Sequence, residues 1–493
     1  MAILAAYAVP HPPLIVHAVG HGREEEIQAT VAAYREVGRR ICELAPETLV
    51  ISSPHSIMYR DYLHISPGSA ASGHFGHFGA PKACHHVRYD EAFVSSLGAA
   101  AAADDLAAGT EGEQDPALDH ATLVPLHFIE EAYREAGRDV DFRVVRIGIS
   151  GLSPAVHYRL GTLIQRVADV LGRRVTYVAS GDLSHRLTKD GPYGFAPEGP
   201  EFDRIACDAF LSGDFLPLLT MSPRLAERAA ECGLRSFQMM AGALDQTELQ
   251  PELLSYEGPF GVGYAVAAFT PCGPERSCPK RDYLNVYEKA RAHEQSERRA
   301  SEDPYVRLAR LSLETHVRDG GRTRLPDDLP KDLTLPDELA TTQAGCFVSL
   351  KKDGELRGCI GTIAPTRESL AEEICANAVS AAVHDPRFAP VRADELDELV
   401  YDVDVLSPSE PIEGPEQLDV RRYGVIVSTT DGRRGLLLPD LDGVDTVDEQ
   451  IDIAARKGGI DLARDGWRLE RFKVVRDRKS TRLTPVTRTY LVC

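Results

Sequence analysis

Two histidines near the start of the chain each follow a short apolar segment and stand beside a proline. His11 comes after AAYAVP, and His55 comes after LVISSP. In open α/β sheets, ligands bind beyond the carboxyl ends of the strands, so residues that directly follow strands are candidates for a site. Two imidazoles from different strands suit a transition metal. The pattern therefore indicates a metal site at one edge of a sheet.

Two later segments carry residues of the same chemical types. LDHATLVPLHF contains Asp119 and His120, and VASGDLSHRL contains Asp182 and His185. Histidine changes protonation near neutral pH, and a neighbouring carboxylate can orient its ring. A single histidine is usually an ordinary surface or core residue, and Asp119 and Asp182 could equally cap a helix or form a turn. Several histidines that each follow a strand favour a shared site.

The elements that would position these residues alternate between strands and helices. Apolar runs predict strands at 2–9, 48–53, 143–150, 175–180 and 263–269. A helix is predicted over 24–45, because its apolar residues recur at spacings of three and four. This alternation predicts an α/β domain with a mixed central sheet flanked by helices over residues 1–270.

The character of the sequence changes after Phe269. Residues 271–302 contain many charges and few large apolar residues, which predicts a linker that becomes a solvated helix. Residues 303–493 predict a smaller α+β domain, with a helix ended by Gly320 and Gly321. Two hairpins are expected there, with turns at Asp353-Gly354 and Asp431-Gly432.

Bulk composition excludes several classes of protein. The 493 residues carry a formal charge of −20, which argues against a nucleic-acid partner because such binding needs a basic face. No apolar run approaches the length of a membrane span, and MAILAAYAVP lacks the basic region of a secretory signal. The 10 cysteines form no C-x-x-C pair, which is typical of reduced thiols in a cytoplasmic protein.

Residues 1–270 resemble the class III extradiol ring-cleavage dioxygenases and their Memo-like relatives. The elements that carry this resemblance are His11-Pro12-Pro13, Ser53-Pro54-His55, SGHFGHFGAP (72–81), Asp119-His120-x-Thr122 and Gly181-Asp182-Leu183-Ser184-His185. The resemblance implies a non-haem Fe(II) held by two histidines and a carboxylate, with zinc and copper as alternative metals. By position the ligands would be His11, His55 and Glu257, with Glu252 and Glu248 as weaker substitutes for Glu257.

The same resemblance implies a reaction. Two histidines and a carboxylate occupy one side of the metal, so that a catechol-like aromatic ring and O₂ can bind at the other. His185 would act as acid and base, and His120 would position substrate or stabilise charge on bound oxygen. Asp119 and Asp182 would orient these rings. Residues 72–81, rich in glycine, are expected to form a flexible wall or lid of the substrate site. A homodimer is expected from the family.

A Memo-like metal-binding or scaffold protein without dioxygenase activity is the alternative. Memo-like relatives can carry a cysteine in place of the carboxylate ligand. Cys207 and Cys232 are the cysteines considered for this role, but both stand in segments with a helical pattern. The sequence therefore favours Glu257 and the enzyme.

The second domain, about 301–493, resembles the AMMECR-type domain through Leu356-Arg357-Gly358-Cys359-Ile360-Gly361-Thr362. Cys359 could be a nucleophile, with His384 as its base and Arg357 as an anion anchor. A small thiol packed in a strand is the favoured alternative. The pairing of the two domain types resembles proteins of the AmmeMemoRadiSam system, which implies a separate radical-SAM enzyme as partner. A third hypothesis is that the chain modifies a protein or nucleotide together with this partner, using Cys359.

Overall fold

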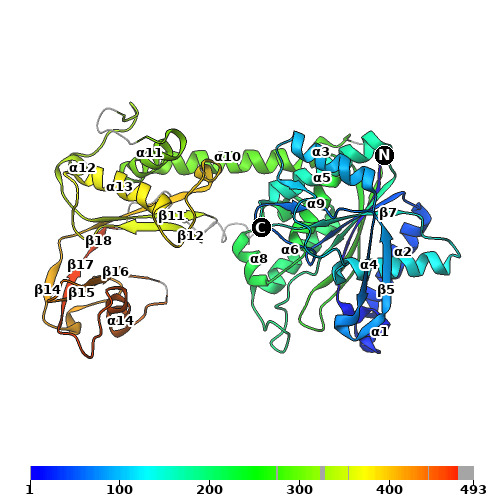
Figure 1. The fold of residues 1–493 in the computed structure, drawn as a ribbon, viewed down its shortest axis with the longest axis horizontal. Helices are drawn as coiled ribbons and strands as arrows, with labels where there is room; N and C mark the ends of the chain where they lie inside the picture. Colours follow the sequence, from blue (N-terminus) through cyan, green and yellow to red (C-terminus); the bar gives the residue numbers. More distant parts are fainter. Residues whose placement is uncertain (1, 274–275, 322–327, 353–354, 442, 476–493) are drawn as a thin grey trace. The chain divides into compact units, whose positions relative to one another are not determined.

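The computed structural model divides the chain into two compact units, residues 1–290 and 291–493. The boundary falls within helix α10 (Tyr283–Ser301), which lies in the segment 271–302 that was expected to be a linker becoming a solvated helix (Figure 1). The structure describes residues 2–273, 276–321, 328–352, 355–441 and 443–475. Each unit is described by itself.

Six strands form the central sheet of the N-terminal unit, in the order β7-β2-β8-β1-β10-β9. They are β1 (Ile3–Val9), β2 (Thr48–Ser53), β7 (Arg143–Gly148), β8 (Val175–Ser180), β9 (Leu249–Glu257) and β10 (Tyr264–Pro271). β7, β2, β8 and β1 are parallel neighbours, whereas β10 is antiparallel to both β1 and β9. The mixed sheet predicted from the sequence is confirmed.

Helices cover both faces of this sheet (Figure 1). They are α1 (His17–Gly20), α2 (Gln28–Leu44), α3 (Glu91–Ala103), α4 (His120–Glu135), α5 (Pro154–Leu171), α6 (Glu198–Ser212), α7 (Leu216–Leu219), α8 (Pro223–Ala229) and α9 (Leu234–Ala243). Along β1, Ala6 and Ala8 belong to one core with α3, α5 and α9, whereas Tyr7 and Val9 belong to a second core with α2 and α4. Alternate residues of a strand point to opposite faces, so β1 contributes to both cores.

The glycine-rich segment 72–81 is more ordered than the sequence suggests. It lies in a hairpin of β4 (Ala70–Phe75) and β5 (Ala80–Arg88), joined by a short 3-10 turn at Gly76–Phe78. Gly79 has a φ of 84°, a conformation that glycine adopts without strain, and this lets the chain reverse. Two further short strands, β3 (Leu63–His64) and β6 (Ala108–Gly109), form a separate parallel pair in this unit.

The C-terminal unit contains two antiparallel four-stranded sheets, β12-β11-β13-β18 and β14-β17-β15-β16. The strands are β11 (Cys346–Lys352), β12 (Glu355–Gly361), β13 (Val400–Leu406), β14 (Glu410–Ile412), β15 (Gly424–Thr429), β16 (Arg434–Leu437), β17 (Trp467–Phe472) and β18 (Val474–Val475). The helices are α11 (Pro304–Asp319), α12 (Asp337–Thr341), α13 (Leu370–Val383) and α14 (Val447–Lys457). The expected α+β character is confirmed. At the predicted Asp431-Gly432 turn between β15 and β16, Gly432 has a left-handed conformation. The other predicted turn, Asp353-Gly354, lies outside the described residues.

Candidate metal centre

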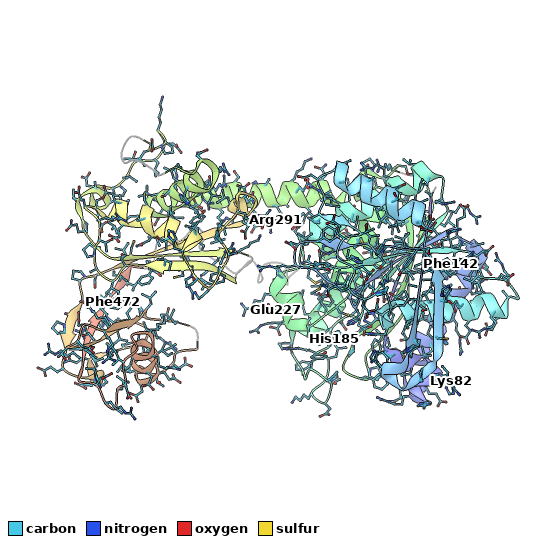
Figure 2. The ribbon with its side chains drawn as sticks, viewed as in Figure 1. Lys82, Phe142, His185, Glu227, Arg291 and Phe472 are labelled. Carbon is cyan, nitrogen blue, oxygen red and sulfur yellow. The ribbon has the colours of Figure 1, made fainter. Side chains whose placement is uncertain are left out.

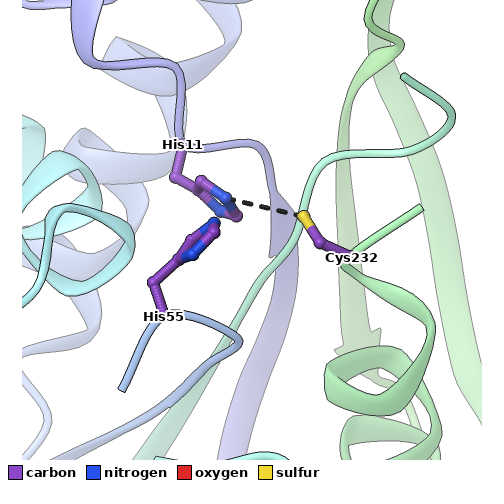
Figure 3. A group of neighbouring side chains, drawn as sticks. All are labelled: His11, His55 and Cys232. Atoms are coloured by element: carbon purple, nitrogen blue, oxygen red, sulfur yellow. Dashed lines mark hydrogen bonds between the residues drawn. The ribbon is translucent and has the colours of Figure 1, made fainter. Parts of the chain in front are cut away.

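His11 and His55 meet at the carboxyl edge of the central sheet. His11 follows β1 after Pro10, and His55 follows β2 in a turn after Pro54. Because β2, β8 and β1 are parallel neighbours, the chain leaves both strands at the same edge. The two imidazole centroids are 4.9 Å apart and the rings are nearly perpendicular. Figure 3 shows the two side chains next to each other. Proximity of these two residues was predicted from their positions after strands.

Cys232 is the third group at this position. One ligand atom of each of His11, His55 and Cys232 lies within 4.8 Å of the others, and Cys232 Sγ is 3.6 Å from His11 Nε2 (Figure 3). Cys232 belongs to the turn between α8 and α9, not to a helix as its pattern suggested. The signal in the sequence was Gly233, which ends the helical pattern directly after the cysteine.

The structure does not bring Glu257 to the two imidazoles, and this corrects the expectation that Glu257 is the third ligand. Its carboxylate accepts hydrogen bonds from the backbone N–H and the Oγ of Thr30, both at 2.7 Å. Thr30 lies in the first turn of α2, where backbone N–H groups have no partner within the helix. Glu257 therefore serves as an acceptor at a helix N-terminus. Glu252 is also engaged elsewhere, in an ion pair with Arg40.

The ring of His11 is held from the side opposite to the centre. Its Nδ1 lies 3.1 Å from the Oγ of Ser180, the last residue of β8. Its backbone N–H donates to Asp182 Oδ1 at 2.7 Å, and His11 is only 2% exposed. These contacts leave Nε2 directed toward Cys232. Asp182 thus supports His11 mainly through the backbone, with its carboxylate 4.0 Å from Nδ1.

His120 and Asp119 reach the centre from the start of α4. Asp119 is the N-cap of this helix and accepts a hydrogen bond from the N–H of Thr122 at 3.0 Å. The same carboxylate oxygen accepts from Ser53 Oγ at 2.6 Å, and Ser53 Oγ accepts from the N–H of His55 at 3.2 Å. The His120 ring lies 4.3 Å from the His55 ring. Asp119 therefore caps the helix and links the two histidine-bearing segments.

His185 follows β8 and lies beside the C-terminal end of α8; it is labelled in Figure 2 near Glu227 of that helix. Its Nδ1 contacts the carbonyl oxygen of Ala230, so that the proton resides on Nδ1 and Nε2 carries a lone pair. His185 Nε2 is 3.9 Å from Asp182 Oδ2. Asp182 therefore stands between His11 and His185, and burial raises its pKa to about 7.

The imidazoles of the site are neutral at physiological pH. Burial lowers the pKa of His11, His55 and His185, and burial together with His55 lowers the pKa of His120 to about 4. Neutral rings carry the lone pairs that metal ions require. Burial, and then the charge of Asp182, raise the pKa of the Cys232 thiol, while coordination to a metal ion deprotonates a thiol.

Two imidazole nitrogens and one sulfur fit a mononuclear metal ion. Zinc, copper and iron all accept this combination of donors, and three protein ligands leave coordination positions for a substrate. Exposure differs among the three residues, since His11 is buried, Cys232 is half-buried and His55 is exposed. The centre is therefore open to solvent on the His55 side.

The C-terminal candidates do not form a catalytic arrangement. Cys359 Sγ accepts a hydrogen bond from Ser349 Oγ at 3.2 Å, and burial raises the pKa of this thiol. Arg357 is occupied by Glu395, with two nitrogen–oxygen distances of 2.9 Å. His384 is an exposed residue that follows α13, and within the described ranges no contact joins it to Cys359. These contacts favour the alternative of a packed thiol.

Comparison with known families agrees with this architecture. The family described as the catalytic LigB subunit of aromatic ring-opening dioxygenase matches residues 5–267, and the AMMECR1 family matches residues 306–476. The chain belongs to the LigB family and carries an AMMECR1 domain after the LigB domain.

Similar proteins include one that matches along both domains. Protein CA_C1420 of Clostridium acetobutylicum is 36% identical over 490 residues, which cover 97% of this chain and 100% of that protein. A Thermotoga maritima protein is 51% identical over 176 residues, or 36% of this chain and 97% of that protein. The crystal structure of uncharacterized protein JW3007 from Escherichia coli K12 covers 54% of this chain and 99% of that chain, with 14% identity and a TM-score of 0.34.

Uncharacterized protein PH0010 from Pyrococcus horikoshii is a further solved structure with similarity to this chain. The match has 34% identity and a TM-score of 0.31, and it covers 34% of this chain and 87% of that chain.

Among the described helices, none combines the length and apolarity needed to cross a bilayer.

Proposed function

We propose that the N-terminal domain is a metal-dependent oxidoreductase that opens a catechol-like aromatic ring with O₂. The observation that carries this proposal is that His120, a histidine outside the ligand set, has its ring 4.3 Å from that of His55 and 5.4 Å from that of His11, where it can contact a metal-bound substrate. Membership of the LigB family supports the reaction class. The metal would be held by His11 Nε2, one nitrogen of His55 and Cys232 Sγ.

The flanking histidines have the protonation states that such a reaction needs. A bound transition metal would supply Lewis acidity and electron transfer between the ring oxygens and O₂. His185 would accept a proton from a substrate hydroxyl at Nε2, because its Nδ1 is engaged by the Ala230 carbonyl. His120, neutral and next to His55, would hold a substrate oxygen by hydrogen bonding.

The full-length protein loaded anaerobically with Fe(II) tests the proposal. Metal analysis is expected to give one ion per chain, and addition of catechol with O₂ is expected to give the visible absorbance of a ring-opened semialdehyde. His55→Ala should abolish both signals. His293→Ala is the matched control, since this side chain is 76% exposed on α10. Undiminished turnover in His55→Ala would contradict the proposal.

A second candidate is a Memo-like metal-binding protein without ring-opening activity. The specific observation in its favour is Cys232, because a thiolate is a softer donor than the expected carboxylate and suits copper and zinc. Parallel loading with Zn(II) and Cu(I) distinguishes the two. Tight binding of either ion that depends on Cys232, without semialdehyde formation in the Fe(II)-loaded protein, would favour this second function.

A further inference from the structure

Three of the exposed aromatic side chains of the N-terminal unit lie in two segments that adjoin the site histidines. Among the described residues of the N-terminal unit, the exposed aromatic side chains are Phe78, Tyr193, Phe195 and Tyr256, at 40%, 60%, 50% and 43%. Phe78 lies in the β4–β5 hairpin, and Tyr193 and Phe195 lie in the segment after His185. Single exposed apolar residues are common on protein surfaces, so the contacts of these rings with the site histidines decide their role.

Phe78 is held against the site by its turn. Its ring centroid lies 5.3 Å from that of His120, with an interplanar angle of 66°. Phe78 ends the 3-10 turn, and Gly79 follows in the left-handed conformation. The N–H of Gly76 donates to His74 Nδ1 at 3.0 Å, which fixes the start of the turn. The aromatic ring is therefore presented by a defined backbone, next to a histidine of the site.

Tyr193 makes a similar ring contact with His185, the other histidine that is not a proposed metal ligand. Its ring centroid lies 5.3 Å from that of His185, with an interplanar angle of 56°. The segment folds back on itself, because the N–H of Ala196 donates to the carbonyl of Arg186 at 3.2 Å. Gly194 has a φ of 70°, which permits the reversal directly after Tyr193. Tyr193 therefore lies at the tip of a closed loop.

We propose that Phe78 and Tyr193 bind the substrate ring and determine specificity for a planar aromatic group. The ring would be placed on the open, His55 side of the centre, within reach of His120 and His185. Aromatic side chains favour planar ligands through offset or edge contacts. This inference rests on the proposed function, because it places the ring at the metal formed by His11, His55 and Cys232.

Binding of 4-nitrocatechol to the Zn(II)-loaded full-length protein tests the inference without turnover, since zinc has no redox chemistry. Visible spectra report binding of this chromophore. Phe78→Ala and Tyr193→Ala are each expected to raise the Kd roughly 5- to 10-fold, from the worth of one aromatic contact. Tyr193→Phe keeps the ring and should bind within about 2-fold of wild type.

Phe195→Ala is the matched control, because Phe195 is exposed in the same loop and, within the described residues, makes no ring contact with the site histidines. It should bind like wild type.

The outcomes separate this inference from the function on which it rests. Wild-type affinity in both alanine variants would overturn the specificity inference and leave the metal centre intact. Failure of the wild-type protein to retain zinc or to bind 4-nitrocatechol would overturn the proposed function and the inference together. Zinc content and thermal unfolding of each variant show whether the exposed substitutions leave the fold and the metal ligands unchanged.

Discussion

Cys232 Sγ lies 3.6 Å from His11 Nε2, although the two residues are 221 positions apart in the chain. Asp182 joins them: its carboxylate accepts the backbone N–H of His11, and its carbonyl accepts the N–H of Gly233 at 3.1 Å. Gly181 allows this approach, because a Cβ there would lie 2.2 Å from the Cα of Gly233. The segment after β8 therefore brings the cysteine turn to the end of β1.

Cys232→Ala and Glu257→Ala distinguish the two possible ligand sets. Cys232→Ala removes a sulfur donor and should weaken metal binding by at least 10- to 100-fold, the range seen even for residues that only support a ligand. Glu257→Ala should keep the metal. It should lower the free energy of unfolding by about 1–3 kcal/mol, because the N–H and hydroxyl of Thr30 lose their acceptor.

The measurements are metal titration with a competing chelator and urea denaturation of each variant. Glu257→Gln is the control, since an amide oxygen still accepts a hydrogen bond from Thr30 and should restore part of the stability. Loss of metal from Glu257→Ala, with retention in Cys232→Ala, would contradict the assignment of Cys232.

Strands that precede the site could be predicted closely from the sequence. The segments 48–53 and 175–180 correspond to β2 and β8 at both ends, because continuous apolar residues are typical of buried parallel strands. Pro10 and Pro54 placed His11 and His55 beyond the sheet edge. The hairpin at 72–81 was less predictable, because glycine indicates a turn but not the pairing of its flanks.

The third ligand could not be predicted for a different reason. Cys232 reaches His11 through the contacts of Asp182 and Gly233, which depend on the packing of α8 and α9 and leave no local periodicity in the sequence. Glu257 was favoured because the family resemblance places the carboxylate ligand late in the domain, just before its last strand. Its register opposite Tyr264 places it on edge strand β9, where the nearby helix α2 takes its carboxylate.

Substitution of His185 should separate catalysis from metal binding. His185→Gln is expected to retain the metal within about 3-fold of wild type and to lower turnover by about 10²- to 10⁴-fold, the usual contribution of general acid–base catalysis. Metal content and the initial rate of semialdehyde formation measure the two effects. His86→Gln, an exposed position on β5, is the control. Metal loss in parallel with activity would instead make His185 a ligand.

Gly358 should matter more than Cys359 for the stability of the C-terminal unit. A Cβ at position 358 would lie 2.1 Å from the carbonyl oxygen of Ala381 in α13, so the helix and β12 would have to separate. Gly358→Ala is expected to lower the free energy of unfolding by about 1–3 kcal/mol, the usual effect of overpacking. Cys359→Ala removes only a thiol that accepts a hydrogen bond from Ser349. This substitution should change the free energy of unfolding by about 0.5–1.5 kcal/mol.

Urea denaturation followed by fluorescence measures both effects, because the single tryptophan, Trp467, lies on β17 of this unit. A larger loss of stability in Cys359→Ala than in Gly358→Ala would contradict this prediction. Loss of a cellular activity in Cys359→Ala without loss of stability would restore the nucleophile hypothesis for that thiol.

Asp385→Asn should reveal a pH-dependent part of the stability of this unit. Arg387 holds the pKa of the Asp385 carboxyl well below its ordinary value, and the carboxylate also accepts the N–H of Cys359 at 2.9 Å. Loss of the charge should lower the free energy of unfolding at pH 7 by about 1–3 kcal/mol.

The direction of the pH dependence follows from that lowered pKa. The unfolded chain takes up the proton first, near pH 4, so the carboxylate stabilises the folded state above that pH, and this contribution is lost as the pH falls toward the folded-state pKa. The difference between wild type and Asp385→Asn should be constant from pH 7 to about 5 and narrow below about 4. Urea denaturation at pH 7, 5 and 3 measures it. Asp431→Asn, where the carboxylate is 56% exposed, is the control and should change stability much less than Asp385→Asn does. A difference for Asp385→Asn that is as large at pH 3 as at pH 7 would show that its effect is steric rather than electrostatic.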